Sequence, residues 1–371
     1  MGSPLYTYVR YRYARTGAFS FGLNLEKDSG EKGWYWKPSR QIFGPDFTSF
    51  HVQIQNRGKL KNLIFGDYQL QLGQGIALGA GFAMGKGAEV IRTTYRSTIG
   101  VRPYTSAVET NFFRGIAATY RLTNRIDFTS FFSRLKRDAT PTSADEADEQ
   151  SAASLPISGY HRTPQERFKQ NTITEQNTGI HILFTSPQKH VQMGITGLHT
   201  VYSIDLQKKD VPYNLFEFSG KQNFLFGIHA DYRWRNLHFF SEGAQSKSNG
   251  RGAVAGLIAG LGKHFDFTVL LRYYDRHFHT LYGNAFAESS RPINENGHYL
   301  AVRYTPFRQL QISLFHDFFR FPWLKYQINS PSQGYQNYIH ALWKPNKKVQ
   351  VYGLLQIKHK PHNFTTTNQP T

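Results

Sequence analysis

Cysteine is absent from the sequence, so the chain can form neither a disulfide bond nor a thiolate metal site. It also lacks the run of about 20 consecutive apolar residues that a membrane-spanning helix requires. The longest uncharged stretch of interest, residues 68–85, is interrupted by three glutamines and five glycines. These absences exclude a disulfide-rich scaffold and argue against a helical membrane protein.

Acidic residues are few: 25 Asp and Glu stand against 44 Lys and Arg, which gives a formal net charge of +19. A balance this basic suits nucleic acid, an anionic membrane surface or acidic substrates as partners. Lysines and arginines on the rims of a membrane protein can equally meet lipopolysaccharide or other anionic headgroups. The charge therefore leaves the partner open.

Aromatic residues are abundant, with 30 Phe, 22 Tyr and 5 Trp, although hydrophobic residues make up only 39% of the chain. Aromatic side chains favour β-strands. A chain rich in them, yet polar overall, is typical of strands that are apolar on one side only.

Residues 223–234 alternate strictly between apolar and polar side chains, which predicts a strand with one apolar and one polar face. Arg235 and Asn236 follow, and Leu237 and Phe239 then resume the apolar positions in the phase that a two-residue hairpin requires. The segment is therefore expected to form a β-hairpin.

The same unit recurs along the chain, always as two alternating strands around a short polar turn. Further turns fall at residues 123–125, 186–190, 263–264, 305–306 and 344–346, and weaker hairpins join 9–13 to 19–25 and 50–54 to 64–72. Long connections separate the hairpins at residues 26–46, 73–111, 136–176, 204–221, 245–251, 275–296 and 320–334. Short turns alternating with long loops are how outer-membrane barrels arrange periplasmic turns and extracellular loops, whereas a soluble β-sandwich has Greek-key crossovers. We predict an all-β fold: an antiparallel up-and-down transmembrane β-barrel of sixteen strands in eight hairpins.

Aromatic residues gather where these strands end. Tyr232, Trp234 and Trp343 precede short turns, and Phe318, Phe319, Phe321 and Trp323 lie beside a long loop. Membrane barrels carry aromatic girdles at both headgroup levels. We expect these side chains to form such girdles.

Two long connections need separate treatment. Residues 73–111 contain a glycine-rich stretch and then further apolar residues, so they form either a plug in the lumen, a long extracellular loop or one more pair of strands, which would give eighteen. Residues 136–176 are expected to be a long flexible loop. The chain begins without an export signal and its topology leaves both ends on the extracellular side, so we expect it to be a fragment of a larger barrel. Apart from these loops, residues 1–371 are predicted to form a single barrel domain.

If the apolar face of each strand meets lipid, the alternating polar residues face the lumen. Charges facing lipid at the midplane would cost about 2 to 4 kcal/mol each for Arg or Lys, so a polar lumen is the consistent placement. Each charged pair could either brace the wall or select solutes, and an excess of arginine would favour anions. The lumen-facing candidates are Arg10, Arg12, Asp67, Arg121, Asp127, His229, Asp231, Arg233, Asp266, Arg272, Arg303 and Asp317.

Catalytic and metal-binding patterns are weak. His316 with Asp317 could be part of a hydrolase site, but adjacent strand residues point to opposite faces. Asp275 and His279 could bind a metal, although a solvated loop is the favoured explanation of both. No cofactor, metal site or catalytic residue is predicted, and the protein is expected not to be an enzyme.

Two stretches resemble a known family. FGDYQLQLGQGIALGAGFAMGKGAEVI (residues 65–91) and GVRPYTSAVETNFFRGIAATY (residues 100–120) resemble the barrel region of large outer-membrane proteins of Bacteroidota that contain helix-hairpin-helix domains, and residues 2–13 and 319–336 are similar too. The resemblance implies a location in the outer membrane of a Gram-negative, Bacteroidota-like bacterium. In that family, helix-hairpin-helix repeats precede the barrel and commonly bind nucleic acid, but this sequence lacks them.

Three functions remain open. The first is an outer-membrane channel, transporter or translocation component with an arginine-rich lumen, embedded in outer-membrane lipid and lipopolysaccharide. The second is a nucleic-acid binding or uptake component that uses the basic surface. The third is a barrel closed to solutes that docks partner proteins of the envelope.

Overall fold

One large β-sheet accounts for most of the chain. The computed structural model describes residues 2–37, 42–79, 85–141, 151–156 and 158–363. Within these ranges, helical structure is limited to the short helix α1 (Pro164–Lys169) and two 3-10 turns, η2 (Arg92–Thr94) and η3 (Pro212–Asn214). None of the helices in these ranges is long and apolar enough to cross a membrane.

Sixteen long strands within the described ranges form a continuous wall in which each pairs antiparallel with the next. They form the eight hairpins that the alternation predicts, so the predicted all-β, up-and-down antiparallel fold is confirmed. In order, the strands are β1 (Thr7–Arg15), β2 (Phe19–Lys27), β5 (Phe47–Arg57), β6 (Leu60–Gln71), β8 (Phe113–Thr123), β9 (Ile126–Arg137), β12 (Ile173–Thr185), β13 (Val191–Leu206), β14 (Gly220–Trp234), β15 (Leu237–Ser246), β16 (Arg251–Leu261), β17 (Phe265–Tyr274), β18 (Glu295–Phe307), β19 (Leu310–Phe321), β20 (Ser332–Trp343) and β21 (Val351–His359).

Five short strands in the described ranges lie at the long-loop end of this wall. β7 (Gly100–Pro103) pairs with the end of β6, where β8 has already diverged. β10 (Thr140–Pro141) pairs with β11 (Ser151–Ser154), which in turn lies parallel to the end of β13. β3 (Tyr35–Lys37) and β4 (Ile42–Gly44) form a separate two-stranded ribbon.

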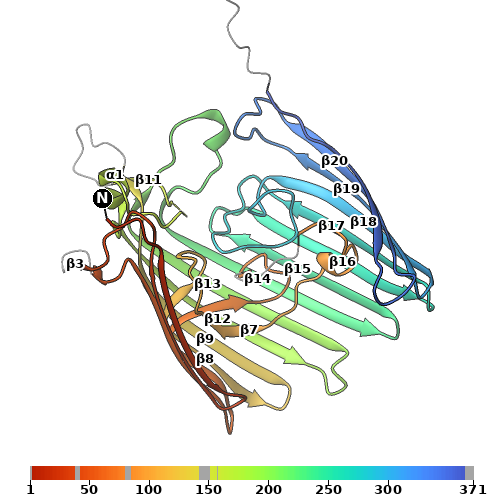
Figure 1. Ribbon diagram of the computed structural model, residues 1–371, viewed down its shortest axis with the longest axis horizontal. Helices are drawn as coiled ribbons and strands as arrows, with labels where there is room; N and C mark the ends of the chain where they lie inside the picture. The colour runs from red at the N-terminus through yellow and green to blue at the C-terminus, as the bar shows by residue number, and fades with distance from the viewer. Residues whose placement is uncertain (1, 38–41, 80–84, 142–150, 157, 364–371) are drawn as a thin grey trace, which may run out of the picture.

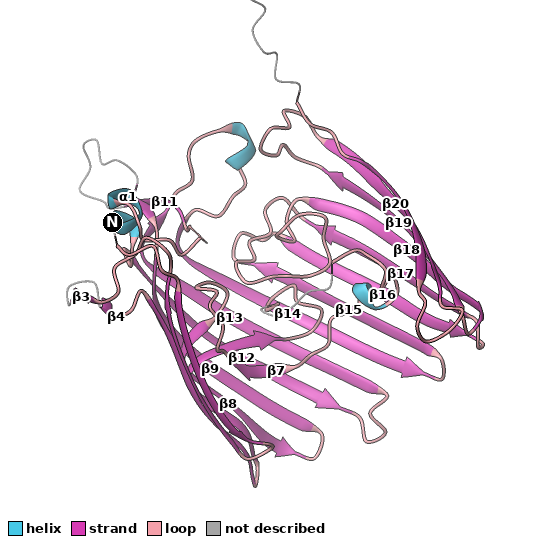
Figure 2. Ribbon diagram, in the orientation of Figure 1, coloured by secondary structure: helices cyan, strands magenta, loops and turns pink. Residues whose placement is uncertain are grey.

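The wall curves strongly, so that the first and last strands stand on opposite sides of a concave space (Figure 1). Loop segments enter this space from the long-loop end (Figure 2). Across the described ranges, β1 pairs only with β2 and β21 only with β20, and every residue of both edge strands is exposed. The curved sheet thus has two unpaired edges.

The convex outer face is apolar. Its side chains are large and about half exposed, including Ile195 (50%), Phe226 (46%) and Leu271 (58%). Tyr232, Trp234 and Trp343 belong to the same face, as the girdle prediction requires. Phe319 and Phe321 do not, because they are buried in contact with each other, with ring centroids 5.6 Å apart, so the prediction that they belong to a girdle was wrong.

Residues 72–79 and 85–99, here called the inner segment, pack against the concave face. Ile76, Leu78 and Val90 are fully buried in one core with wall residues from β6, β8, β9 and β13 to β20. If the apolar side of β6 faced lipid, Tyr68 and Leu70 would point outward, but both are fully buried in this core. That prediction was wrong because the inner side of the wall is apolar where the inner segment packs against it.

Residues 158–171 form an ordered loop end around α1. Thr163 caps the helix by accepting the Glu166 N–H, and the Glu166 carboxylate accepts the Thr163 N–H, with Pro164 at the first helical position. This capping box is visible in the sequence and could have identified the helix. The acidic run at residues 145–149 lies outside the described residues.

Candidate functional site: the inner wall and the inner segment

Two pairs among the predicted lumen residues join directly opposite positions of neighbouring strands. Arg121 Nε lies 2.9 Å from Asp127 Oδ1 across the β8–β9 hairpin, and Arg303 Nη2 lies 2.7 Å from Asp266 Oδ2 across β17 and β18. Such cross-strand pairs stabilise the local register. Their side chains remain partly exposed, so they brace the wall near its short-turn end.

The edge strand β1 carries two arginines toward the concave face. Arg10 Nη2 donates to Thr105 Oγ1 at 3.2 Å, and Arg12 is the strand partner of Gly22. Together with Arg102, they line a polar cavity of about 300 Å³. Unlike the braced arginines, Arg10 and Arg12 take part in no ion pair with the residues that the structure describes.

His229 and Asp231 are buried on the inner face of β14, whereas Arg233 at its short-turn end is exposed. Asp231 Oδ1 lies 2.9 Å from His238 Nε2 on the adjacent strand. His229 stacks on His181 of β12, with ring centroids 5.4 Å apart and an interplanar angle of 9°. The strand between them carries Gly194, and a Cβ there would lie 2.1 Å from His229 Nε2 and 2.6 Å from His181 Cε1.

Asp67 is placed differently from the prediction. The alternation of β6 puts it on the side of Phe65, which is 57% exposed, and not on the side of Tyr68. Its carboxylate nevertheless has no exposed surface, because it receives Arg114 Nε at 2.6 Å and the Phe50 N–H at 3.1 Å. Asp67 of β6 thus bonds to both neighbouring strands, β5 and β8, and does not line the concave space.

Arg272 and Asp317 lie at the centre of a buried ionic cluster. Arg272 Nε donates to Glu295 Oε1 at 2.6 Å, and its Nη1 donates to Asp317 Oδ1 at 2.8 Å, with all three side chains completely buried. Lys86 of the inner segment bonds to Asp317 and to Glu288, the latter at 2.7 Å. The ionic cluster therefore joins three wall strands to the inner segment and to the loop between β17 and β18.

Cations and carboxylates are nearly matched in the ionic cluster. Glu288 also receives Lys358 of β21 at 2.7 Å and Lys360 at 3.3 Å, and Glu295 accepts the backbone N–H groups of Glu288 and Ser289. Buried charges require such partners, since removing one leaves the other uncompensated. The pattern predicted Arg272 and Asp317 as inward residues, but nothing in the sequence spacing pointed to Lys86 or Glu288.

A second attachment holds the inner segment on β15. Glu242 accepts the backbone N–H of Ile76 at 3.1 Å with Oε2 and that of Ala77 at 3.0 Å with Oε1. Gly73 allows this approach, because a Cβ there would lie 2.7 Å from Glu242 Oε2, and its φ of 55° favours glycine. Sequence reasoning missed Glu242, although the glycine-rich stretch signalled a close backbone contact.

Several buried polar atoms on the inner wall have no hydrogen-bond partner among the described residues. They include both ring nitrogens of His229, Asn223 Oδ1, His181 Nε2 and His340 Nδ1. Buried polar groups of this kind are satisfied by ordered water when the protein does not satisfy them. Water is therefore expected at these positions of the inner wall, beside the apolar core in which the inner segment packs.

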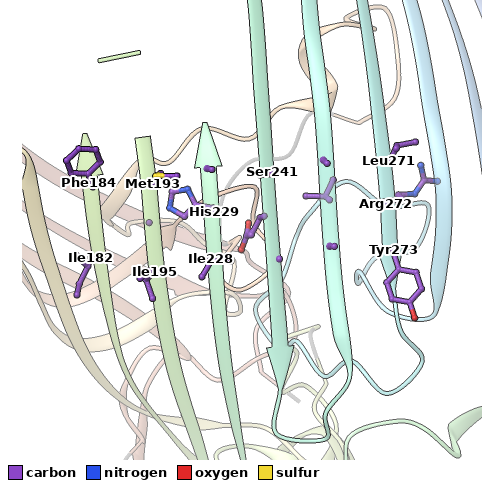
Figure 3. A pocket seen from close by; sticks show the side chains of 17 residues that line it. Ile182, Phe184, Met193, Ile195, Ile228, His229, Ser241, Leu271, Arg272 and Tyr273 are labelled. Carbon is purple, nitrogen blue, oxygen red and sulfur yellow. The ribbon is translucent and has the colours of Figure 1, made fainter. Parts of the chain in front are cut away.

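The outer face carries a contrasting apolar groove of about 710 Å³ (Figure 3). Small residues of β14 to β16, among them Ala230, Gly243 and Ala255, form its floor. Ile195 and Leu271 are among the large residues that line it. Its lining is suited to hydrocarbon and not to a polar solute.

The weaker candidates are not assembled into sites. His316 Nδ1 lies 2.6 Å from Asn337 Oδ1, whereas Asp317 belongs to the ionic cluster on the opposite face. His279 Nε2 bonds to the carbonyl of Phe216 at 2.9 Å, away from Asp275. Neither pair forms a reactive arrangement.

No family model and no curated protein matches the sequence. Among solved structures, the chain is similar to three outer-membrane proteins of Pseudomonas aeruginosa. OccK2 (OpdF) shares 10% identity over 94% of this chain and 84% of that chain, with a TM-score of 0.45. OpdK shares 10% over 96% and 87% with a TM-score of 0.45, and OprD shares 8% over 95% and 86% with a TM-score of 0.44.

Proposed function

We propose that the protein is an outer-membrane β-barrel channel, transporter or translocation component in which the inner segment controls passage. The observation that carries this proposal is the contrast between the two faces of the wall. The outer face is apolar and exposed, as a lipid-facing surface must be, while the inner face holds charged and incompletely paired polar groups. A soluble sheet would have no use for so large an exposed apolar face.

The attachments of the inner segment support a gating role. Glu242 and the ionic cluster hold it at two places, so that it occupies the concave space without being part of the wall. Both attachments are polar and reversible. Displacing the segment would expose the hydrated inner wall.

Small anions are the solutes that the inner wall favours. Arg10 and Arg12 line a cavity on the concave side and pair with no described carboxylate. The chain as a whole has a net charge of +19. A positively lined passage concentrates anions and repels cations.

The first test is insertion. The chain, expressed with an export signal, is expected in the outer-membrane fraction as a heat-modifiable species whose gel mobility differs before and after boiling. A soluble product without that shift would contradict the membrane assignment.

The second test is conductance of the folded full-length chain in planar lipid bilayers. Replacing residues 74–98 with a short Gly-Ser linker is expected to increase conductance. Shortening the exposed turn at residues 345–348, at the short-turn end of the wall, serves as the control and should leave it unchanged. If neither the intact chain nor the shortened variant conducts, the channel proposal fails.

Selectivity is measured as the reversal potential in a salt gradient. The intact chain is expected to prefer chloride over potassium, and R10E with R12E should shift the reversal potential toward that of potassium. K347E with K348E, in the exposed turn between β20 and β21, is the charge-matched control. An unchanged reversal potential in the R10E/R12E variant would remove these arginines from the selectivity argument. Nucleic-acid binding, the docking of envelope proteins and membership of the Bacteroidota helix-hairpin-helix family stay predictions from the sequence.

A further inference from the structure

Three long-loop connections bring one histidine and four carboxylates together beyond the end of the wall, a group here called the loop cluster. Glu31 follows β2, Asp46 precedes β5, Glu109 precedes β8, Asp138 follows β9 and His161 precedes α1. They come from positions up to 130 residues apart in sequence. None of them contributes to the inner wall or to the attachments of the inner segment.

His161 is the centre of the loop cluster. Its Nδ1 lies 2.6 Å from Asp46 Oδ2, its Nε2 lies 2.7 Å from Asp138 Oδ2, and its backbone N–H donates to Glu31 Oε1 at 2.7 Å. The side chains of His161 and Asp46 are 4% and 1% exposed, so the contacts are shielded from water. The ligand atoms of Glu31, Asp46 and His161 all lie within 4.8 Å of one another.

Glu109 completes the group. It lines a cavity of about 140 Å³ together with Asp46, Asp138 and His161. Its carboxyl group makes no hydrogen bond or ion pair with any residue that the structure describes. Gly159 leaves room for it, because a Cβ there would lie 2.8 Å from the Glu109 carboxyl group.

The loop cluster carries more negative charge than its surroundings balance. The nearest cations lining the cavity are already engaged, Arg114 with Asp67 and Arg137 with Glu175, while Lys136 is partly exposed. Burial and the neighbouring Asp46 raise the pKa of Glu109 to about 9, and burial and Asp46 likewise raise that of Glu31 to about 6. The raised pKa keeps Glu109 neutral near pH 7, and one imidazolium does not balance the remaining carboxylates, so a further positive charge would stabilise the group.

We propose that the loop cluster binds one divalent cation through Glu31, Asp46 and His161, with Glu109 as the fourth ligand. A mixed imidazole and carboxylate set suits Zn²⁺ better than Ca²⁺ or Mg²⁺, which prefer oxygen alone. His161 would bind through Nδ1 after losing its proton. Its Nε2–H would then donate to Asp138, the carboxylate–histidine–metal arrangement that orients metal-binding histidines.

The site has a structural consequence, because its ligands come from separate loops. A cation there would cross-link the three connections β2–β5, β6–β8 and β9–β12 at the long-loop end. The alternative is a metal-free cluster held by a protonated His161 between Asp46 and Asp138. That arrangement requires no ion, and the experiment below distinguishes the two.

The folded full chain is solubilised in detergent, treated with a chelator and freed of it. Binding of Zn²⁺ alone is then measured by calorimetry. One equivalent is expected to bind, and D46N is expected to abolish binding at that stoichiometry. Asp138→Asn weakens the hydrogen bond that orients His161 and should weaken binding by about 10- to 100-fold. Asp210→Asn, which removes a carboxylate from an exposed loop outside the loop cluster, is the matched control and should bind like the unmodified chain.

E109Q guards against variants that do not fold, since Glu109 makes no contact that folding needs and its loss should still weaken Zn²⁺ binding. Heat modifiability verifies the fold of each variant. Substitution with Co²⁺ is expected to give visible absorption that D46N removes. Absence of Zn²⁺ binding by the unmodified chain would overturn the proposal in favour of the metal-free cluster. Equal Zn²⁺ binding by the unmodified chain, D46N and E109Q would place the ion elsewhere, and tighter binding of Ca²⁺ than of Zn²⁺ would contradict the proposed ligand set.

Discussion

Glu242 Oε1 accepts the backbone N–H of Ala77 at 3.0 Å, although the two residues are 165 positions apart in sequence. This bond fixes the inner segment to the middle of the wall. Its acceptor is a side chain and its donor is backbone, so the carboxylate can be changed without altering the sequence of the inner segment.

Glu242→Ala should loosen the inner segment. The substitution leaves the N–H groups of Ile76 and Ala77 without their acceptor, at a cost of about 1 to 3 kcal/mol for each buried group. We expect faster amide hydrogen exchange in residues 74–79 and higher conductance. Ser241→Ala, on the same strand but on the outer face, should change neither, and unchanged exchange in E242A would show that the attachment is dispensable.

Arg272→Met should destabilise the protein far more than Arg303→Met. Arg272 is completely buried, and its loss leaves the buried Glu295 and Asp317 uncompensated, at about 3 to 5 kcal/mol. Arg303 is 27% exposed, so its pair with Asp266 should contribute about 1 kcal/mol or less. Urea-induced unfolding in lipid vesicles measures the difference, and equal effects would contradict this ranking.

Ile195→Arg places a charge on the outer face, where Ile195 is half exposed. If this face meets lipid, the substitution should cost about 2 to 4 kcal/mol near the bilayer midplane. The fraction of chain that folds into vesicles, scored by heat modifiability, is expected to fall. Gln207→Arg, on a long loop, is the matched control, and equal folding of both variants would argue against a lipid-facing surface.

The metal-free loop cluster should weaken in alkaline solution. Burial alone would lower the pKa of His161, but the hydrogen bonds with Asp138 and Asp46 outweigh burial and raise it from 6.5 to about 10. Because the folded value is the higher one, this stabilisation is complete below about pH 6.5 and is lost as the pH rises toward 10. Glu109 acts in the same direction, since its raised pKa makes ionisation above about pH 4.5 unfavourable in the folded state.

Limited proteolysis of the loops in the presence of chelator measures this dependence. Cleavage near residues 158–163 should accelerate between pH 7 and pH 10 in the unmodified chain. In His161→Gln it should be rapid at both values. Protection that does not change with pH would refute the assignment of a charged His161.

The strands were predictable because alternation is a local signal. Residues 223–234 and the turn at Arg235 and Asn236 form the hairpin that their pattern indicates. The inner contacts were not predictable in this way. Lys86 meets Asp317 across 231 positions, and no periodicity records a pairing between a loop and a wall.

The error in β6 has the same origin. Tyr68 and Leu70 follow the apolar alternation that elsewhere marks the lipid side, yet they contact the inner segment. From its own sequence, a strand whose inner side is apolar cannot be distinguished from a strand whose outer side is apolar. The segment that packs against it must be known before the phase can be assigned.

Two glycines on facing surfaces have a joint effect that neither has alone. Gly194 leaves space for the rings of His181 and His229 to stack across the backbone of β13. On the inner segment, a Cβ added to Gly73 would lie 3.0 Å from His229 Cβ. The inner segment can approach the wall closely here because neither glycine has a side chain. A single methyl group at either position would separate the two surfaces, so these glycines set how closely the inner segment approaches the wall without supplying any bond that holds it there.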